Sequence, residues 1–416
     1  MARDFFTLDD FDLSGRTVLL RVDINSPIDP TTGRILSDAR IREHAATIRD
    51  LHRSKVAVLA HQSRPGKDDF TTLEPHAERL ASVLGQPVQY VDSLYGRHAL
   101  DAVRSLKDGD VAVLENTRFY AEEEALAEKP FEKQAQAHMV RRLAPLADFF
   151  VLDAFAAAHR AQPSLVGFCD LLPTLAGRIM ERELAMLSRA LQSEDRPKIA
   201  IFGGIKADDS LAITEHMLDR EIVDKVLTTG GVANVFLEAR GVNLGEATSG
   251  FMAREIDAYP SLVDRARAIL RRHGDRVLTP SDVVVNDRGR RRPILVSRLP
   301  SEHQVYDVGL DTIARYIDEI RSAKTIIANG PAGVFELDEF SVGTRELFAA
   351  VAGADAFTVV GGGHTVAAVE QLGLRTSMDH VSTGGGALIN FLAGKELPLV
   401  AALRRSRAKF PAGPQR

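Results

Sequence analysis

Short, β-branched apolar runs alternate along this chain with longer stretches in which apolar residues recur at helical spacing. This alternation constrains the fold more than any other feature of the sequence. In the first half of the chain, the runs occupy residues 17–24, 56–60, 111–116 and 149–155. In the second half, they occupy residues 198–204, 225–231, 325–331, 357–363 and 380–386. Such alternation is typical of parallel strands joined by crossover helices. The sequence therefore predicts an α/β fold built on parallel sheets.

The strands fall into two groups, and one helical stretch separates them. With 416 residues, the chain has the length of roughly two or three typical domains. From about residue 176 to 192, leucines and methionines recur every three or four residues, which predicts a helix between Pro173 and Pro197. We expect two Rossmann-like α/β/α domains with parallel sheets, joined by a hinge helix, with a cleft between them. The basic tail from residue 404 onward is expected to be partly unanchored.

Composition argues against several classes of protein. The 52 basic and 57 acidic side chains give a net charge of −5, so the chain has no general attraction to nucleic acid. Its single cysteine, Cys169, cannot form an internal disulfide and is expected to be buried packing in a reducing cytoplasm. No apolar run approaches the roughly 18 residues that a membrane-spanning helix needs, and the N-terminal segment is too acidic for a signal peptide. We expect a cytoplasmic protein without nucleic-acid or membrane partners.

The residues that follow the expected strands differ between the two halves. Ligands collect at the carboxyl ends of parallel strands, so these residues are the candidates for a site. In the first half they are polar or charged, namely Asp23, Asn25, His61, Arg64, Arg118, His159 and Arg160. In the second half they are glycines, namely Gly203, Gly204, Gly230, Gly231, Gly361 to Gly363 and Gly384 to Gly386. The first half thus offers cationic side chains to a ligand, and the second offers bare backbone.

Glycines at strand ends let consecutive backbone N–H groups approach phosphate oxygens. A lone glycine pair is better explained by the tight turns that any α/β protein needs, whereas the two glycine triplets favour a phosphate site. Neither triplet fits G-x-G-x-x-G, because Val366 and Ile389 occupy the sixth positions, and no G-x-x-x-x-G-K-[ST] occurs. The second half is therefore predicted to bind a nucleotide without a standard dinucleotide or P-loop fingerprint.

The arginines of the first half suit a small polyanion. Guanidinium groups bind carboxylate and phosphate through paired hydrogen bonds, although each arginine alone could equally be a surface residue. The candidates that could converge are Arg40, Arg64, Arg118 and Arg160, together with His61. Asp23 and Asn25 suit the hydroxyls of the same ligand, although an Asn before Ser26 and Pro27 is also ordinary turn chemistry.

In the second half, Lys206 follows a glycine pair, where its ammonium group could neutralise a moving phosphoryl group. Taken alone, Lys206 is better explained as an exposed lysine at a strand end. Asp208 and Asp209 are expected to cap a helix that begins near Ser210. The 12 histidines show no H-E-x-x-H or comparable ligand spacing, so no protein-caged transition metal is expected.

Taken together, these segments form a string of motifs that is more specific than any one of them. In chain order they read RVDINSP, HQSRPG, LENTRFY, DAFAAAHR, FGGIK, NGPAGVFE, VVGGGHT and STGGGA. This series spans nearly the whole chain and resembles the phosphoglycerate kinase family. His364, Ser210 and Gln162 resemble its archaeal branch, since the common family pattern has Asp, Lys and His at these positions.

The resemblance implies a phosphotransferase with a carboxyl group as acceptor. It would exchange a phosphoryl group reversibly between 1,3-bisphosphoglycerate and ADP, giving 3-phosphoglycerate and ATP in glycolysis and gluconeogenesis. Mg²⁺ would arrive as MgATP or MgADP, and the chain would act as a monomer or homodimer. Residues 1–172 would bind phosphoglycerate, 173–193 would form the hinge helix, 194–394 would bind nucleotide, and 395–416 would return to the first domain. The hinge would close to bring the two ligands together.

Carried over by motif, the resemblance also implies site residues. The phosphoglycerate ligand would be held by Asp23, Ile24, Asn25, Arg40, His61, Gln62, Ser63, Arg64, Arg118 and Arg160. The nucleotide would be held by Gly204, Lys206, Gly230, Gly231, Asn329, Pro331, Gly333, Val334, Glu336, Gly361, Gly362, Gly363, His364, Thr365, Thr383, Gly384 and Gly385. Catalysis would involve Arg40, Lys206, Gly362 and Gly385, and no side chain is expected to be a metal ligand. No general base is needed, because the attacking carboxylate is already ionised at neutral pH.

Two alternative functions are weighed against this one. A dinucleotide-dependent dehydrogenase is disfavoured by the missing glycine fingerprint and by the arginines of the first half. A non-catalytic or altered-substrate homologue that binds the same ligands is disfavoured by the presence of Lys206 and Arg40. Two departures from the common pattern stay open at this stage. His364 is a poor ligand for Mg²⁺, which prefers oxygen, and Ser210 removes a cation whose replacement the sequence does not reveal.

Overall fold

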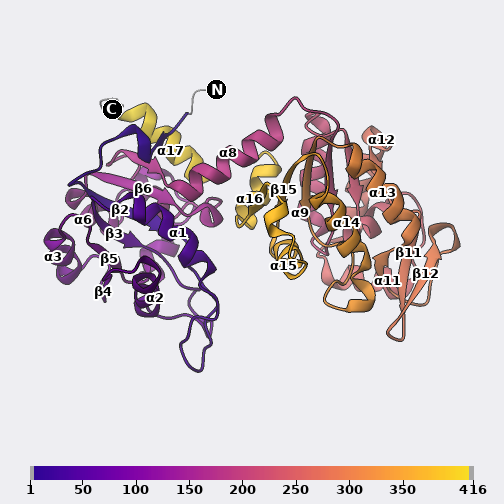
Figure 1. The fold of residues 1–416 in the computed structure, drawn as a ribbon, viewed down its shortest axis with the longest axis horizontal. Coiled ribbons are helices and arrows are strands. Elements are labelled where there is room, and N and C mark those ends of the chain that lie inside the picture. The colour runs from indigo at the N-terminus through magenta and orange to yellow at the C-terminus, as the bar shows by residue number, and fades with distance from the viewer. Residues whose placement is uncertain (1–3, 412–416) are drawn as a thin grey trace. The chain divides into compact units, whose positions relative to one another are not determined.

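The structure is a computed structural model that describes residues 4–411 of the chain. It contains two compact units, each with its own core. The first comprises the described residues through Leu184 together with those from Glu396 onward, and the second is Ala185–Lys395. The helix predicted between the halves forms as α8 (Arg178–Gln192), along which the chain passes from one unit to the other (Figure 1).

The first unit is built on a seven-stranded parallel sheet with the strand order β1-β7-β6-β2-β3-β5-β4. The strands expected from the sequence are β2 (Thr17–Val22), β3 (Lys55–Leu59), β5 (Val111–Leu114) and β6 (Phe149–Asp153). Three short strands complete the sheet, namely β1 (Phe6–Thr7), β4 (Gln89–Val91) and β7 (Thr174–Ala176). Their sequences are too short to carry a recognisable apolar period.

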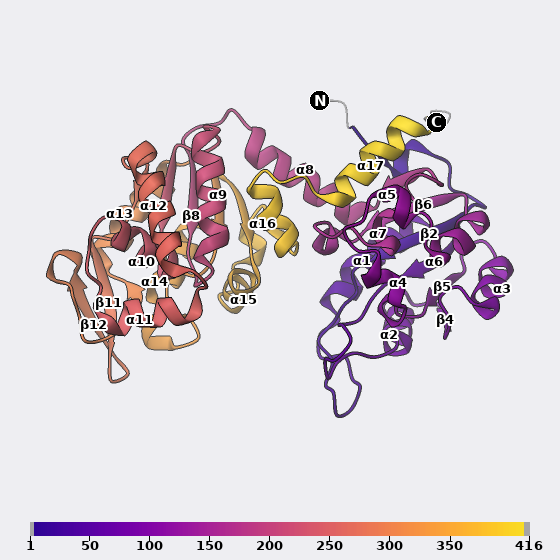
Figure 2. The ribbon, with the colours of Figure 1, turned by 180° about the vertical axis from the view of Figure 1, so that it is seen from behind.

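Helices cover both faces of this sheet (Figures 1 and 2). One face is covered by α1 (Ala39–Asp50) and α2 (Glu74–Leu84), whose apolar side chains pack with buried valines and leucines of the strands. The remaining helices are α3 (Arg97–Ser105), α4 (Ala121–Ala125), α5 (Phe131–Gln134), α6 (His138–Leu143), α7 (Pro163–Val166) and α17 (Pro398–Lys409). Burial on both faces explains why these strands are almost wholly apolar.

The second unit is built on a six-stranded parallel sheet with the order β10-β9-β8-β14-β15-β16. Its strands are β8 (Lys198–Phe202), β9 (Lys225–Thr228), β10 (Val277–Leu278), β14 (Thr325–Asn329), β15 (Phe357–Gly361) and β16 (His380–Ser382). Its helices are α9 (Ala207–Asp219), α10 (Gly230–Ala239), α11 (Glu246–Glu255), α12 (Tyr259–His273), α13 (Leu310–Ser322), α14 (Val342–Ala352), α15 (Gly363–Gln371) and α16 (Gly386–Leu392). Figures 1 and 2 show α13 and α14 on one face of the sheet and α9, α10 and α12 on the other. The predicted α/β class with two parallel sheets is therefore confirmed.

The second unit also carries a small antiparallel sheet that the sequence did not reveal. Its strands are β11 (Asp282–Asp287), β12 (Arg290–Leu295) and β13 (Val305–Val308), in the order β12-β11-β13. Val283, Val284 and Val285 of the central strand are buried, whereas the arginine-rich edge strand is mostly exposed. Figure 1 shows the β11–β12 hairpin at the rim of the unit.

One local expectation was wrong. Helix α9 begins at Ala207, so Asp208 and Asp209 lie inside its first turn instead of capping a helix that begins near Ser210. Acidic residues are favourable there as well, because the first turn carries the positive end of the helix dipole. The tail is anchored through Lys409, since it forms the end of α17, which packs on β7 and α7. Residues 412–416 of the tail lie outside the described part.

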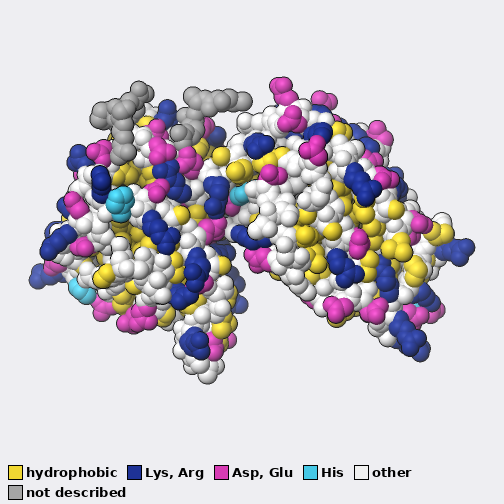
Figure 3. Space-filling model, viewed as in Figure 1, with side chains coloured by type: hydrophobic (Ala, Val, Ile, Leu, Met, Phe, Trp, Pro, Cys, Tyr) yellow, Lys and Arg dark blue, Asp and Glu magenta, His cyan; other side chains and the backbone are white. Residues whose placement is uncertain are grey.

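Three further features concern the surface charge, the length of the helices and the single cysteine. On the face shown in Figure 3, cationic and anionic side chains are interspersed over both units. Among the described residues, no helix has the length and apolar character needed to cross a membrane. Cys169 is a buried free thiol, and burial raises its pKa to about 12.

Candidate active site

The carboxyl ends of the strands in the first unit line a polar cavity of about 750 Å³. Predicted residues in its lining are Asn25, Ser63, Arg64, Arg118 and Arg160. The sequence analysis did not assign the other polar residues of the lining, which are Lys67, Asp69, Glu124, Glu128 and Gln162. The loops after β2, β3, β5 and β6 therefore bring three of the predicted arginines to one place.

Arg40 and Asp23 lie next to this cavity and hold each other. Arg40, in the first turn of α1, places Nη1 2.9 Å from Oδ1 of Asp23. Oδ1 of Asp23 also accepts a hydrogen bond of 3.2 Å from the backbone N–H of Asn25, a residue of the cavity lining. Burial alone would raise the pKa of Asp23, but Arg40 and the neighbouring histidines and Arg21 outweigh it and hold that pKa well below its usual range. The carboxylate is therefore ionised, and one of its oxygens is directed at Arg40.

Arg21 is the main residue of this site that the sequence analysis missed. It lies within β2, is 1% exposed, and donates hydrogen bonds to the carbonyls of Val22 and Leu59. Its Nη2 lies 2.9 Å from Nδ1 of His61. Burial lowers the pKa of Arg21 to about 10, so it stays charged at neutral pH. A lone arginine in an otherwise apolar strand is the signal that could have identified it.

The charge of Arg21 fixes the state of His61. Burial, and then Arg21, lower the pKa of His61 well below its usual value, so the ring is neutral at pH 7. Because Arg21 can only donate, Nδ1 of His61 accepts and the ring proton resides on Nε2. A neutral imidazole of this form can donate one further hydrogen bond from Nε2.

Two of the predicted glycerate-binding residues, Ile24 and Gln62, are buried more deeply than the others. Ile24 is 1% exposed and Gln62 is fully buried. Gln62 accepts from the Ser26 backbone and donates to its carbonyl, both at 3.0 Å, and thereby joins the loops after β2 and β3. Ser63 follows with a φ of 54°, and its N–H donates to Oδ1 of Asn25 at 2.9 Å. Gln62 thus holds the loops that present Asn25, Ser63 and Arg64.

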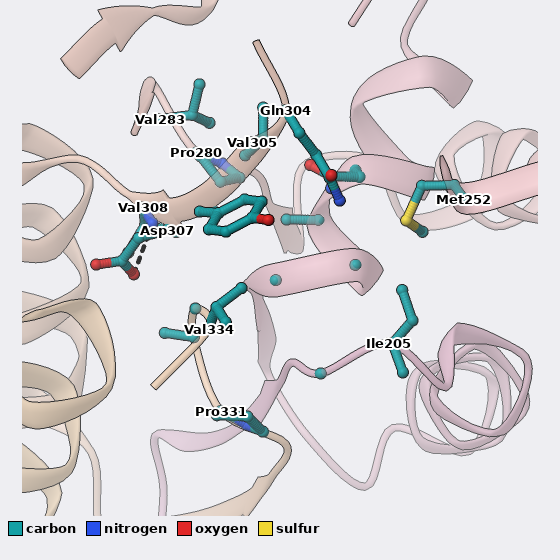
Figure 4. A pocket seen from close by; sticks show the side chains of 18 of the residues that line it. Ile205, Met252, Pro280, Val283, Gln304, Val305, Asp307, Val308, Pro331 and Val334 are labelled. Carbon is teal, nitrogen blue, oxygen red and sulfur yellow. Dashed lines mark hydrogen bonds between the residues drawn. The ribbon is translucent and has the colours of Figure 1, made fainter. Parts of the chain in front are cut away.

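In the second unit, a cavity of about 320 Å³ lies beside the glycine loops (Figure 4). Predicted residues in its lining are Gly204, Gly230, Gly231, Pro331, Gly333, Val334, Glu336 and His364. Apolar side chains that the sequence analysis did not assign supply most of the remaining wall, including Ile205, Met252, Pro280, Val283 and Val305. Figure 4 shows Gln304 reaching from the strand side toward Met252 across this wall. A mostly apolar cavity with a few polar groups suits a flat heterocycle such as a nucleobase.

This wall was missed because much of it comes from the antiparallel sheet, whose strands the sequence did not predict. One polar residue, Asn234 on α10, is 5% exposed and lines the cavity. It stands one turn after Gly230 and Gly231, which were predicted. The helical repeat of α10 places Asn234 on the same face as these glycines, and this spacing could have identified it.

The other predicted nucleotide residues lie at the same edge of the sheet, outside the cavity lining. They are Lys206 at the start of α9, Asn329 at the end of β14, Gly361 to Gly363 and Thr365 around the start of α15, and Thr383 to Gly385 before α16. The start of α15 is tightly built, because Gly362 has a φ of 91° and a Cβ there would lie 2.1 Å from Oδ1 of Asn329. The hydroxyl of Thr365 accepts a 2.6 Å hydrogen bond from the backbone N–H of Gly330. Free N–H groups at such a helix start can bind anionic oxygens.

Of two positions that depart from the common family pattern, His364 is exposed, and Ser210 is buried with its hydroxyl hydrogen-bonded within its own helix turn. His364 places Nδ1 3.6 Å from Oε1 of Glu336, and both side chains are more than half exposed. Ser210 is buried, and its hydroxyl donates to the carbonyl of Lys206 at 3.4 Å. Within residues 4–411, no group of three or more His, Cys, Asp or Glu side chains is placed to hold a metal ion.

Comparison with known proteins agrees with this geometry. A family model described as phosphoglycerate kinase matches residues 8–395. The phosphoglycerate kinase of Methanothermus fervidus is 47% identical over 407 residues, which cover 97% of this chain and 98% of that protein. That of Thermoplasma acidophilum is 47% identical over 407 residues, covering 98% and 99%.

Solved structures are similar throughout the chain. The crystal structure of phosphoglycerate kinase from Pyrococcus horikoshii matches with a TM-score of 0.88 and 43% identity, covering 97% of this chain and all of that one. The structure of phosphoglycerate kinase from Coxiella burnetii matches with a TM-score of 0.79 and 32% identity, covering 96% and 98%. On the strength of the family model, the relatives and these structures, the chain belongs to the phosphoglycerate kinase family.

Proposed function

We propose that the protein catalyses reversible phosphoryl transfer between 1,3-bisphosphoglycerate and ADP, giving 3-phosphoglycerate and ATP. The observation that carries this proposal is the pairing, in one chain of this family, of an arginine-lined cavity with an apolar cavity edged by glycine loops. The first suits a small phosphorylated acid and the second suits a nucleotide. The reaction belongs to glycolysis and gluconeogenesis, and we place it in the cytoplasm.

The first unit would bind the glycerate ligand. Arg64, Arg118 and Arg160 line the same cavity and would bind its phosphate and carboxylate oxygens through paired hydrogen bonds. Asp23 and Asn25 would accept from its hydroxyl group. Arg40 is already held by Asp23 at 2.9 Å and would approach the acyl phosphate.

The second unit would bind the nucleotide. The base would lie against the apolar wall around Val283 and Val334, with Glu336 on the ribose. The phosphates would approach the starts of α10 and α15, where glycines leave backbone N–H groups accessible. The glycine loop before α16 would support the transferred phosphoryl group.

The chemistry needs positioning and charge neutralisation rather than proton transfer. In the ATP-consuming direction, a carboxylate oxygen of 3-phosphoglycerate attacks the γ-phosphorus, the bond from that phosphorus to the β,γ-bridging oxygen breaks, and ADP leaves. Lys206 and Arg40 would balance the negative charge on the oxygens in transit. Mg²⁺ would enter as part of the nucleotide substrate and would be held by phosphate oxygens and water, since the imidazole of His364 is a poor ligand for it.

A coupled assay tests the proposal. The protein is incubated with 3-phosphoglycerate and MgATP, together with an acyl-phosphate-reducing dehydrogenase and NADH. Oxidation of NADH that depends on all components is the expected result. Replacing 3-phosphoglycerate with 2-phosphoglycerate should abolish it, since a phosphate on the neighbouring carbon could not reach the arginines while the carboxylate is placed for attack. Binding of both ligands without NADH oxidation would instead establish a non-catalytic homologue.

A further inference from the structure

Helix α1 carries a line of polar side chains that runs away from the proposed glycerate site. Arg40, His44, Thr47 and Asp50 recur at intervals of three or four residues, so they share one face of the helix. Arg40 stands at the end next to Asp23. Asp50, at the other end, pairs with Arg178 in the first turn of α8 at 2.6 Å. His44 and Thr47, the two middle members of this line, are buried.

His44 bridges the Asp23 backbone and the Asp153 carboxylate. It is 4% exposed, and its Nε2 lies 3.3 Å from the backbone nitrogen of Asp23. Its Nδ1 lies 3.2 Å from Oδ2 of Asp153. A backbone N–H can only donate, so Nε2 must accept and the ring proton must lie on Nδ1, where it is donated to Asp153. The partners therefore select one neutral tautomer of His44.

Asp153 in turn holds the start of α8. It is fully buried at the end of β6, and its Oδ1 accepts from the backbone N–H groups of Ile179 and Met180 at 2.8 and 3.2 Å. Its Oδ2 accepts from the Thr47 hydroxyl at 2.6 Å. Gly177 leaves room for this arrangement, since a Cβ there would lie 2.4 Å from Oδ1 of Asp153. The helix start and Thr47 thus already compensate the buried carboxylate.

The two hydrogen bonds of His44 differ in how far each partner depends on His44. Asp153 has three other hydrogen bonds, so the bond from His44 is one of several that satisfy it. The backbone N–H of Asp23, in contrast, donates to Nε2 of His44. Asp23 is the residue whose carboxylate holds Arg40. The contribution specific to His44 is therefore to fix the main chain of Asp23 relative to β6 and α8.

We propose that His44 is a positioning residue of the glycerate site: through the Asp23 backbone N–H and the Asp153 carboxylate, it sets the place from which Asp23 and Arg40 meet the ligand. The proposal rests on the proposed function. His44 does not line either cavity described above, so it acts through Asp23 and does not touch the reacting atoms.

The test compares two substitutions at the same position. His44→Asn keeps a donor close to Asp153 but is too short to accept from Asp23. His44→Gln reaches the Asp23 N–H with its amide oxygen. Loss of one hydrogen bond should raise the KM for 3-phosphoglycerate about three- to tenfold in His44→Asn, with the KM for MgATP unchanged. In His44→Gln, the KM for 3-phosphoglycerate should return toward the wild-type value.

Ile48→Val is the matched control, because Ile48 is buried on the same helix but belongs to the apolar core. It should lower the thermal unfolding temperature and leave both KM values unchanged. If His44→Asn behaves like Ile48→Val, or raises both KM values equally, His44 is only a packing residue and the proposal fails. A wild-type protein without kinase activity would overturn the proposed function instead, and the two failures are therefore distinguishable.

A spectroscopic measurement gives a second, independent outcome. Long-range ¹H–¹⁵N correlation spectra of the wild-type protein, assigned by comparison with His44→Gln, report which ring nitrogen of His44 is protonated. Protonated Nδ1 at neutral pH is expected. Protonated Nε2 would exclude the hydrogen bond from Asp23 and overturn the proposal, even if every variant were fully active.

Discussion

Arg21 and Asp23 stand two positions apart at the end of β2, and both are buried with opposite charges. The strand-end rule identified Asp23, His61 and the arginines of the cavity because each follows an apolar run directly. It missed Arg21, because a residue inside a strand is assigned to packing unless its partners are known. Those partners, His61 and the carbonyl of Leu59, come from another strand and are invisible in local sequence. The strand-end residues of the candidate site were thus predictable in position, whereas the buried groups that hold them were not.

Replacing either proposed neutralising cation should slow the reaction strongly. Arg40→Ala and Lys206→Ala should each lower kcat by about 10² to 10³, the usual effect of losing one group that stabilises transition-state charge. The matched controls are Arg42→Ala, an exposed neighbour on α1 that pairs with Asp38, and Lys324→Ala, an exposed lysine that pairs with Asp355. Both controls should keep near-normal turnover in the coupled assay. Near-normal turnover in Arg40→Ala and Lys206→Ala would refute these roles.

Buried histidines should make the first unit sensitive to mild acid. His76 is fully buried, and its Nε2 lies 3.0 Å from Oε1 of Gln62. Burial lowers its pKa to about 4. Because the unfolded chain takes up this proton near pH 6.5, the neutral ring contributes stability that is complete above pH 6.5 and is lost as pH falls toward 4. The loss amounts to about 3 kcal/mol at most.

The variant His76→Gln isolates this contribution. Its amide can still donate to Gln62 but does not titrate. Urea unfolding at several pH values between 7 and 4 should show a shallower loss of unfolding free energy in His76→Gln than in the wild-type protein. Parallel pH dependences of the two proteins would show that His76 is not the group responsible.

Among the secondary-structure elements, the parallel strands were predictable and the small antiparallel sheet was not. Strands buried on both faces are continuous apolar runs, which a sequence displays directly. Strand β12 is an exposed edge strand that reads Arg-Arg-Arg-Pro-Ile-Leu, with Pro293 opposite Val284. Proline is tolerated at such an edge, but it argues against a strand when the sequence is read alone. Since β11 and β13 line the cavity proposed for the nucleotide, its apolar wall was missed with them.

The start of α15 should tolerate no side chain at Gly362. This residue has a φ of 91°, and a Cβ added to it would lie only 2.1 Å from Oδ1 of Asn329. Gly362→Ala should raise the KM for MgADP at least about tenfold, because the clash would displace the backbone N–H groups proposed to bind the phosphates, and each loss of about 1.4 kcal/mol in binding is tenfold. Gly373→Ala is the matched control beyond the other end of α15, with a φ of 68° and no atom within 4 Å of the added Cβ.

The control should lose about 1 to 2 kcal/mol of stability through its backbone conformation alone and keep a normal KM. Both variants are compared by steady-state kinetics and thermal unfolding. An unchanged KM for MgADP in Gly362→Ala would show that the start of α15 does not contact the nucleotide.

At the scale of the whole molecule, length and strand grouping predicted two parallel-sheet units and a helix leading from one to the other. The first unit is not continuous in the chain, because it also includes the residues from Glu396 onward. Local periodicity does not reveal this, since a helix of given amphipathic pattern can pack on either sheet. Ser406 is fully buried on α17, where its hydroxyl accepts from the β7 backbone, and no local pattern announces that partner.

Transfer between ligands held by different units requires those ligands to meet. We expect the radius of gyration in solution scattering to fall when 3-phosphoglycerate and MgADP, a pair that cannot react, are added together. Either ligand alone should have a smaller effect, because closure excludes water only around the complete pair. A radius that does not change with both ligands present would count against closure.

The hydrogen bond of 2.8 Å from the Thr174 backbone to the Ser406 hydroxyl has a consequence for biosynthesis. A ribosome makes β7 more than two hundred residues before it makes the α17 residue that covers it. The second unit is continuous in the chain, and all of its strands are synthesised before α17. The first unit is therefore the first to begin synthesis and the last to have all of its residues.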